Sequence, residues 1–116
     1  MTYVDGYVLP LPAKNIKAYK KLASMGKRMW MEAGALDYKE CVGDDLATKF
    51  GQPFGKTLKV KRGETVIFAF VVFKSRAHRD KVNASVIKAM MSKPMPKEFP
   101  FDMKRMVYGG FKTLVG

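Results

Sequence analysis

The ten residues from Glu64 to Phe73 constrain the fold most, because they form the most apolar strand-like segment of the chain. Successive side chains of a β-strand point to opposite faces. One face here would carry Val66, Phe68, Phe70 and Val72, and the other Ile67, Ala69, Val71 and Phe73. A strand that is apolar on both faces needs cover on both. The uninterrupted apolar run, residues 66–73, is eight residues long, whereas a membrane-spanning helix needs about 20, so we expect no transmembrane segment.

The pattern along the whole chain predicts one α+β domain over residues 1–116. Strands are expected at 3–11, 35–43, 64–73 and 105–115, and helices at 13–33 and from the N-cap residue Ser75 to Pro94. Residues 44–63 indicate a long loop with a short strand near Leu58. In the last strand, Gly109 and Gly110 indicate a bulge or a close backbone approach. The order β-α-β-β-α-β is the ferredoxin-like arrangement, with an antiparallel sheet and both helices on one face.

The second face of the sheet predicts self-association. Two helices cover only one face of a four-stranded sheet, and the strand at 64–73 would leave large apolar side chains on the other. An exposed apolar patch of that size usually marks an interface. We therefore expect a homodimer in which two sheets close against each other into an α+β barrel, with the helices outside.

The chain also contains five distinctive segments in order: YVDGYVLP at 3–10, ECVGDD at 40–45, GETV at 63–66, SRAHRDKVN at 75–83 and PFDMKRM at 100–106, the last followed by Gly109, Gly110 and Phe111. Together these resemble the YbaA-like family of domains of unknown function (domain-of-unknown-function 1428). The resemblance implies a dimeric α+β barrel of the ferredoxin-like kind, in a superfamily that includes monooxygenases and haem-degrading enzymes. It implies no particular activity, and the loop at 46–58 departs most from the family pattern.

The first group of candidate site residues lies at the start of the second predicted helix, around the only histidine of the chain. An unperturbed histidine titrates near neutral pH, so His78 is the first candidate for acid–base catalysis, with Asp80 close by. Arg76, Arg79 and Asn83 are candidates for binding an anion or ligand, because helix N-termini attract negative charge. The alternative is structural: Arg76 pairs with Asp80 one turn away, and His78 packs near the dimer seam.

The second group of candidates follows the strand at 35–43 and the region near residue 104. Tyr38 and Glu40 share one face of their strand and could take part in acid–base chemistry around an apolar pocket. Lys104 and Arg105 are candidate ligand-binding cations, or alternatively the structural partners of Asp102.

Several further features leave two interpretations open. Trp30 could line a pocket between the first helix and the sheet, or pack in the core. Five of the nine methionines fall within residues 90–106, as core filler or as an adaptable ligand surface. Residues 68–73 match the second half of an RNA-recognition signature, but the basic residue and glycine of the first half are missing, so we interpret these aromatic rings as interface core. Because Cys41 is the only cysteine, we expect no intrachain disulfide and no cysteine zinc cluster. A lone histidine is not a metal site, so we expect no metal, and we expect no cofactor.

Charge completes the functional prediction. The chain carries 22 Lys and Arg against 10 Asp and Glu, a net charge of +12, most of which falls on the two predicted helices. The N-terminus shows no secretory leader pattern, so we expect a cytoplasmic protein. The leading hypothesis is a homodimer that binds a small molecule between helices and sheet. The alternative is non-specific binding of RNA or another polyanion to the basic helical surfaces.

Overall fold

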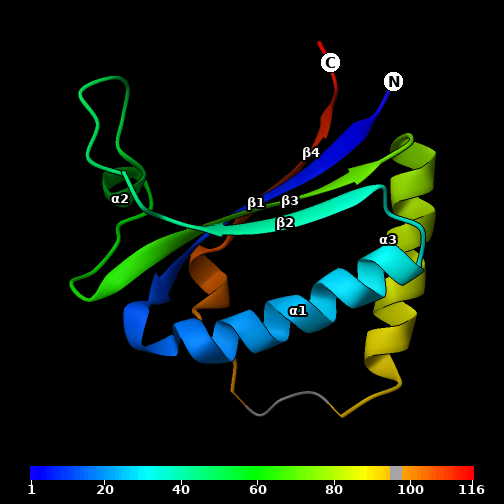
Figure 1. Ribbon diagram of the computed structural model, residues 1–116, viewed down its shortest axis with the longest axis horizontal. Coiled ribbons are helices and arrows are strands. Elements are labelled where there is room, and N and C mark those ends of the chain that lie inside the picture. The colour runs from blue at the N-terminus through cyan, green and yellow to red at the C-terminus, as the bar shows by residue number, and fades with distance from the viewer. Residues whose placement is uncertain (95–97) are drawn as a thin grey trace.

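The computed structural model describes residues 1–94 and 98–116 (Figure 1). Its long elements are β1 (Tyr3–Pro12), α1 (Ile16–Glu32), β2 (Asp37–Val42), β3 (Glu64–Phe73), α3 (Arg76–Met91) and β4 (Val107–Lys112). Three short helical segments are η1 (Ala13–Asn15), α2 (Phe54–Thr57) and η2 (Met103–Arg105). The long strands and helices therefore follow the predicted order. No helix among the described residues is long and apolar enough to cross a membrane.

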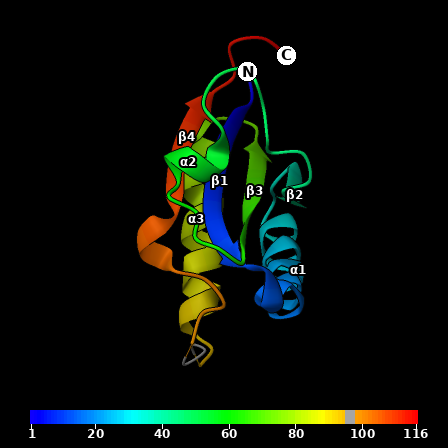
Figure 2. The ribbon, with the colours of Figure 1, turned by 90° about the vertical axis from the view of Figure 1, so that its left-hand side faces the viewer.

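The four strands form one antiparallel sheet in the order β2-β3-β1-β4, which can be followed across Figure 2. Strand β1 pairs along its whole length with β3, from Tyr3 opposite Phe73 to Pro12 opposite Glu64. The register also aligns two rows across the sheet. Asp5, Val71 and Tyr38 lie opposite one another, and so do Tyr7, Ala69 and Glu40. Both rows point to the face that the long helices cover.

Both long helices lie on that one face, as predicted (Figure 1). Helix α1 runs along the sheet, and α3 crosses near the C-terminal end of α1. Helix α3 begins where expected, because the Ser75 side chain accepts a hydrogen bond from the His78 backbone N–H at 3.1 Å. The buried core has two parts. One lies between α3 and the sheet and contains Val71, Phe73, Val82, Val86 and Ala35, and the other lies between the start of α1 and the sheet and contains Leu9, Leu11, Tyr19 and Ile67.

Among the described residues, the opposite face of the sheet is covered at one end only. There α2 and its flanking loop pack over the sheet, and Val66 is buried. Farther along, Phe68 is 46% exposed, and on β4 Val107 and Phe111 are 55% and 61% exposed. The two-faced strand β3 therefore buries its helix-facing side chains within this chain and leaves part of its other face open.

Two local predictions need correction. Near Leu58 the chain forms the short helix α2 in place of a strand, because the Pro53 carbonyl accepts hydrogen bonds from the N–H groups of Lys56 and Thr57. In β4 the register with β1 continues through both glycines without a bulge. The alternative, a close approach, is what occurs: a Cβ at Gly110 would lie 2.9 Å from a ring carbon of Tyr3.

Candidate functional site

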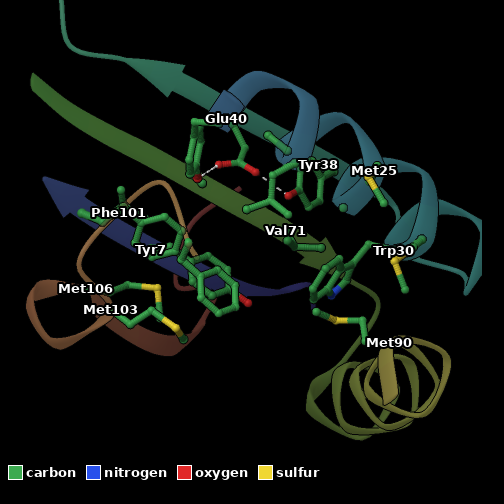
Figure 3. Close-up of a pocket in the computed structure, with 18 of the residues that line it drawn as sticks. Tyr7, Met25, Trp30, Tyr38, Glu40, Val71, Met90, Phe101, Met103 and Met106 are labelled. Carbon is green, nitrogen blue, oxygen red and sulfur yellow. Dashed lines mark hydrogen bonds between the residues drawn. The ribbon is translucent and has the colours of Figure 1, made fainter. Parts of the chain in front are cut away.

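A cavity of about 380 Å³ lies between the sheet, α1, the end of α3 and the segment that leads into β4 (Figure 3). That volume falls in the range of small-molecule sites, which is about 300–1,000 Å³. The floor is formed by Ala69 and Val71 of β3, and the inner face of α1 supplies one wall. Met25, Met90 and Met103 at the margin are partly exposed, so the cavity is open to solvent on that side. Trp30 lines the cavity and also packs against the buried core beside α3, so both interpretations left open by the sequence describe part of its surroundings.

Aromatic rings and methionines make up most of the wall. Tyr7 stacks on Tyr108 at 4.8 Å between ring centroids, Trp30 tilts against Tyr38 at 5.9 Å, and Tyr19 meets Phe101 edge-on at 5.7 Å. Five methionines also line the space: Met25, Met29, Met90, Met103 and Met106. Three of these, Met90, Met103 and Met106, belong to the methionine-rich stretch at 90–106. Met95 of that stretch lies outside the described residues.

Glu40 places a carboxylate in this apolar setting. Its Oε2 accepts a hydrogen bond from the Tyr38 hydroxyl at 2.5 Å, and its Oε1 accepts a short hydrogen bond from the Tyr19 hydroxyl (Figure 3). Burial and, next, the hydrogen bond to Glu40 raise the pKa of both phenols well above the usual value of 10.0. Both hydroxyls therefore stay protonated at neutral pH and act as donors, which fixes Glu40 as the acceptor.

A second polar cluster lies beside the cavity and is centred on Asp5, whose side chain is 0% exposed. Arg79 Nη1 donates to Asp5 Oδ1 at 3.1 Å, and Asn83 Nδ2 donates to Asp5 Oδ2 at 3.1 Å. Asn83 Oδ1 in turn accepts the Trp30 indole N–H at 3.0 Å. Arg79 also donates to the Tyr108 hydroxyl at 2.9 Å. This network connects β1, α3 and α1, and it holds the indole ring that lines the cavity.

The structure separates the first group of predicted site residues. His78 Nδ1 accepts the Lys74 backbone N–H at 3.0 Å, and its ring packs edge-on against Phe73. Asp80 is exposed and pairs with Arg79 Nε at 2.8 Å in place of the predicted partner Arg76. Among the described residues, neither His78 nor Asp80 lines the cavity, whereas Tyr38 and Glu40 do.

The other predicted cations also have structural surroundings. Arg105 binds Glu64 through two hydrogen bonds of 2.8 and 2.6 Å and Asp102 through one of 3.1 Å. The hydrogen bonds from Arg105 lower the pKa of Glu64 from 4.5 to about 2. The Asp102 side chain caps η2 by accepting a hydrogen bond from the Lys104 backbone N–H at 3.0 Å, and the side chains of Lys104 and Arg76 are exposed. Arg79 and Asn83 both donate hydrogen bonds to the buried Asp5 carboxylate.

Comparison with known proteins agrees with the resemblance noted in the sequence. The profile of a family described as "Protein of unknown function (DUF1428)" matches residues 2–103. This chain belongs to the DUF1428 family. Two relatives of the chain are the proteins described as "Uncharacterized protein YbaA" from Escherichia coli strain K12 and from Shigella flexneri. Each is 37% identical over 119 residues, covering 99% of this chain and 98% of the relative.

Sequence reasoning left three residues of this DUF1428 chain out of the candidate site although they shape it. Tyr19 counted only as an apolar position of the first helix, although its hydroxyl reaches Glu40 from 21 positions away in the sequence. Asp5 and Tyr7 lie two positions apart on β1, so the alternation of side chains along a strand predicts that they share one face of the sheet. Asp5 is an acid within an otherwise apolar strand, and this pattern was the available signal, because a buried acid needs a charged or hydrogen-bonding partner.

Proposed function

We propose that this protein binds a small molecule with an apolar body in the cavity between its helices and its sheet. The observation that carries the proposal is a cavity of about 380 Å³ that holds one hydrogen-bonded carboxylate, Glu40, among aromatic and methionine side chains. Ligand sites commonly combine a mostly apolar wall with a few polar groups that orient the ligand. Methionine side chains adapt to varied ligand shapes, which suits the open margin of this cavity.

The test uses the only tryptophan of the chain, Trp30, which lines the cavity. Phenylbutanol titrated into the protein is expected to change Trp30 fluorescence in a saturable way and to raise the melting temperature. Ala69→Leu places a larger side chain on the cavity floor and should abolish this binding. Ala18→Leu adds the same group at an exposed position of α1 and should leave it unchanged. Equal binding by both variants would place the probe elsewhere and contradict the proposal.

The proposal includes a ferredoxin-like homodimer closed through the open sheet face. Phe68 and Phe70 of β3 and Val107 and Phe111 of β4 share the face that the long helices do not cover. A two-fold axis would bring this patch against the same patch of a second copy. Light scattering coupled to gel filtration should give twice the monomer mass for the wild type. It should give the monomer mass for Phe68→Asp, whereas Ile87→Asp, at a 54% exposed position of α3, should remain dimeric.

A second candidate function, polyanion binding, rests on the outer surface of the first helical segment. Six basic side chains there are all exposed: Lys14, Lys17, Lys20, Lys21, Lys27 and Arg28. Such a surface attracts phosphates without sequence preference. Binding of single-stranded RNA should then fall steeply with salt, and Lys20→Glu combined with Lys21→Glu should weaken it. Failure to bind RNA at about 50 mM salt would rule out this function. Equal affinity for heparin would show that RNA itself is not recognised.

A further inference from the structure

The charge inside the cavity is opposite in sign to the net charge of the protein. The chain has a net charge of +12, yet the carboxylate of Glu40 lies within the cavity wall among apolar groups. The other charged residue among the described lining residues is Lys93, which is exposed and follows the end of α3 at the rim. A ligand that enters the cavity therefore leaves the positive outer surface and meets a negative group inside.

Glu40 still has hydrogen-bonding capacity to offer a ligand. An ionised carboxylate has about four acceptor sites, two on each oxygen. Tyr19 uses one site on Oε1, and Tyr38 uses one on Oε2. One site on each oxygen is left, and both tyrosines are held protonated, so neither can supply a negative charge in place of Glu40. A group that donates hydrogen bonds, and above all a cation, complements this carboxylate.

The surrounding rings favour the same chemistry. The faces of tyrosine and tryptophan rings attract organic cations within about 6 Å of the ring centroid, and this attraction strengthens in a desolvated site. Tyr7, Trp30 and Tyr38 contribute such rings to the cavity, and Figure 3 shows them arranged around the same space as Glu40. The methionine sulfurs add polarisable surface without adding positive charge.

We infer that the cavity selects an organic ammonium ion with an apolar body, its nitrogen facing Glu40 and its carbon chain lying among the aromatic rings and methionines. This inference rests on the proposed ligand-binding function and specifies the ligand class. The competing class is an organic anion held by Lys93 at the rim. Net charge favours that anion, so selection of a cation by a protein of this charge is a specific property of the cavity.

The test compares three probes of similar size and different charge: phenylbutylammonium, phenylbutanol and phenylbutyrate. Their affinities are measured at neutral pH by isothermal titration calorimetry and by Trp30 fluorescence. We expect the cation to bind the unaltered chain about tenfold or more tightly than the alcohol, and the anion to bind most weakly. An anion that binds as tightly as the cation overturns the inference. If none of the three binds, the proposed function itself fails.

A variant assigns the selectivity to Glu40. Glu40→Gln retains the shape of the side chain and removes its charge, so the cation should lose its advantage over the alcohol while the alcohol still binds. Glu32→Gln removes the same charge at the exposed end of α1 and should keep the wild-type ratio. An unchanged ratio in Glu40→Gln contradicts the inference. The three-probe comparison on the unaltered chain decides the ligand class even if Glu40→Gln folds poorly.

Discussion

Replacing Asp5 by asparagine is the most demanding test of the packing around the cavity. Asp5 is fully buried, and its two oxygens each accept a hydrogen bond of 3.1 Å, one from Arg79 and one from Asn83. The substitution retains the side-chain shape but removes the charge that balances Arg79. It also turns one acceptor into an NH₂ group, which must then face a donor.

The expected loss of stability follows from these contacts. Removing one partner of a buried ion pair costs about 3–5 kcal/mol, because the remaining charge stays buried without compensation. Asp80 also contacts Arg79 but is exposed and therefore compensates weakly, so we expect a loss of about 3 kcal/mol. Domains of this size are stable by roughly 5–15 kcal/mol, so the variant should still fold with a markedly lower urea midpoint.

The assay is urea unfolding followed by Trp30 fluorescence, at one fixed protein concentration for all variants. The matched control is Asp80→Asn, which removes the other acid that contacts Arg79 at a position 61% exposed. That control should lose no more than about 1 kcal/mol. If Asp5→Asn loses no more than the control, the buried network does not stabilise the fold as described.

Three further predictions concern other parts of the structure. Glu64→Gln should lower the free energy of unfolding at neutral pH. Because Arg105 lowers the pKa of Glu64 from 4.5 to about 2, the wild type loses this ion pair as pH falls through that interval, and the difference in stability between the two proteins should shrink. A pH-independent difference would argue against this ion pair. His78→Ala should lower the free energy of unfolding by about 1 kcal/mol, because the hydrogen bond from the Lys74 backbone N–H is lost, and it should leave phenylbutanol affinity within about twofold of the wild type. A larger loss of affinity would show that His78 contributes to the binding site. Gly26→Ala should weaken phenylbutanol binding and fail to raise the melting temperature, because its Cβ would lie 2.8 Å from the Tyr38 hydroxyl; a gain of about 1 kcal/mol, as usual for this change in a helix, would show that Tyr38 yields easily.

The fold was largely predictable because its signals are local. Alternation of side chains placed Tyr38 and Glu40 on one face of β2, and the helical period placed Trp30 on the inner face of α1. Spacing also explains why the side chains of His78 and Asp80 point in different directions. Residues two positions apart in a helix differ by about 200° in direction, whereas residues four positions apart share a face. Arg79 and Asn83 satisfy that second rule, and both reach Asp5.

The cavity was not predictable in the same way, because it depends on side-chain volumes that meet across the sheet. Ala69 lies between Tyr7 on β1 and Glu40 on β2, so the smallest side chain of the row is at its centre. A leucine there would extend the apolar core, and filling a cavity commonly stabilises a protein. The Ala69→Leu variant therefore separates two explanations of the space. If it gains stability and the wild type binds none of the three probes, the space is a packing defect. If it gains stability but loses a probe that the wild type binds, the space is a binding site, and the aromatic rings and Glu40 around it determine which ligand fits.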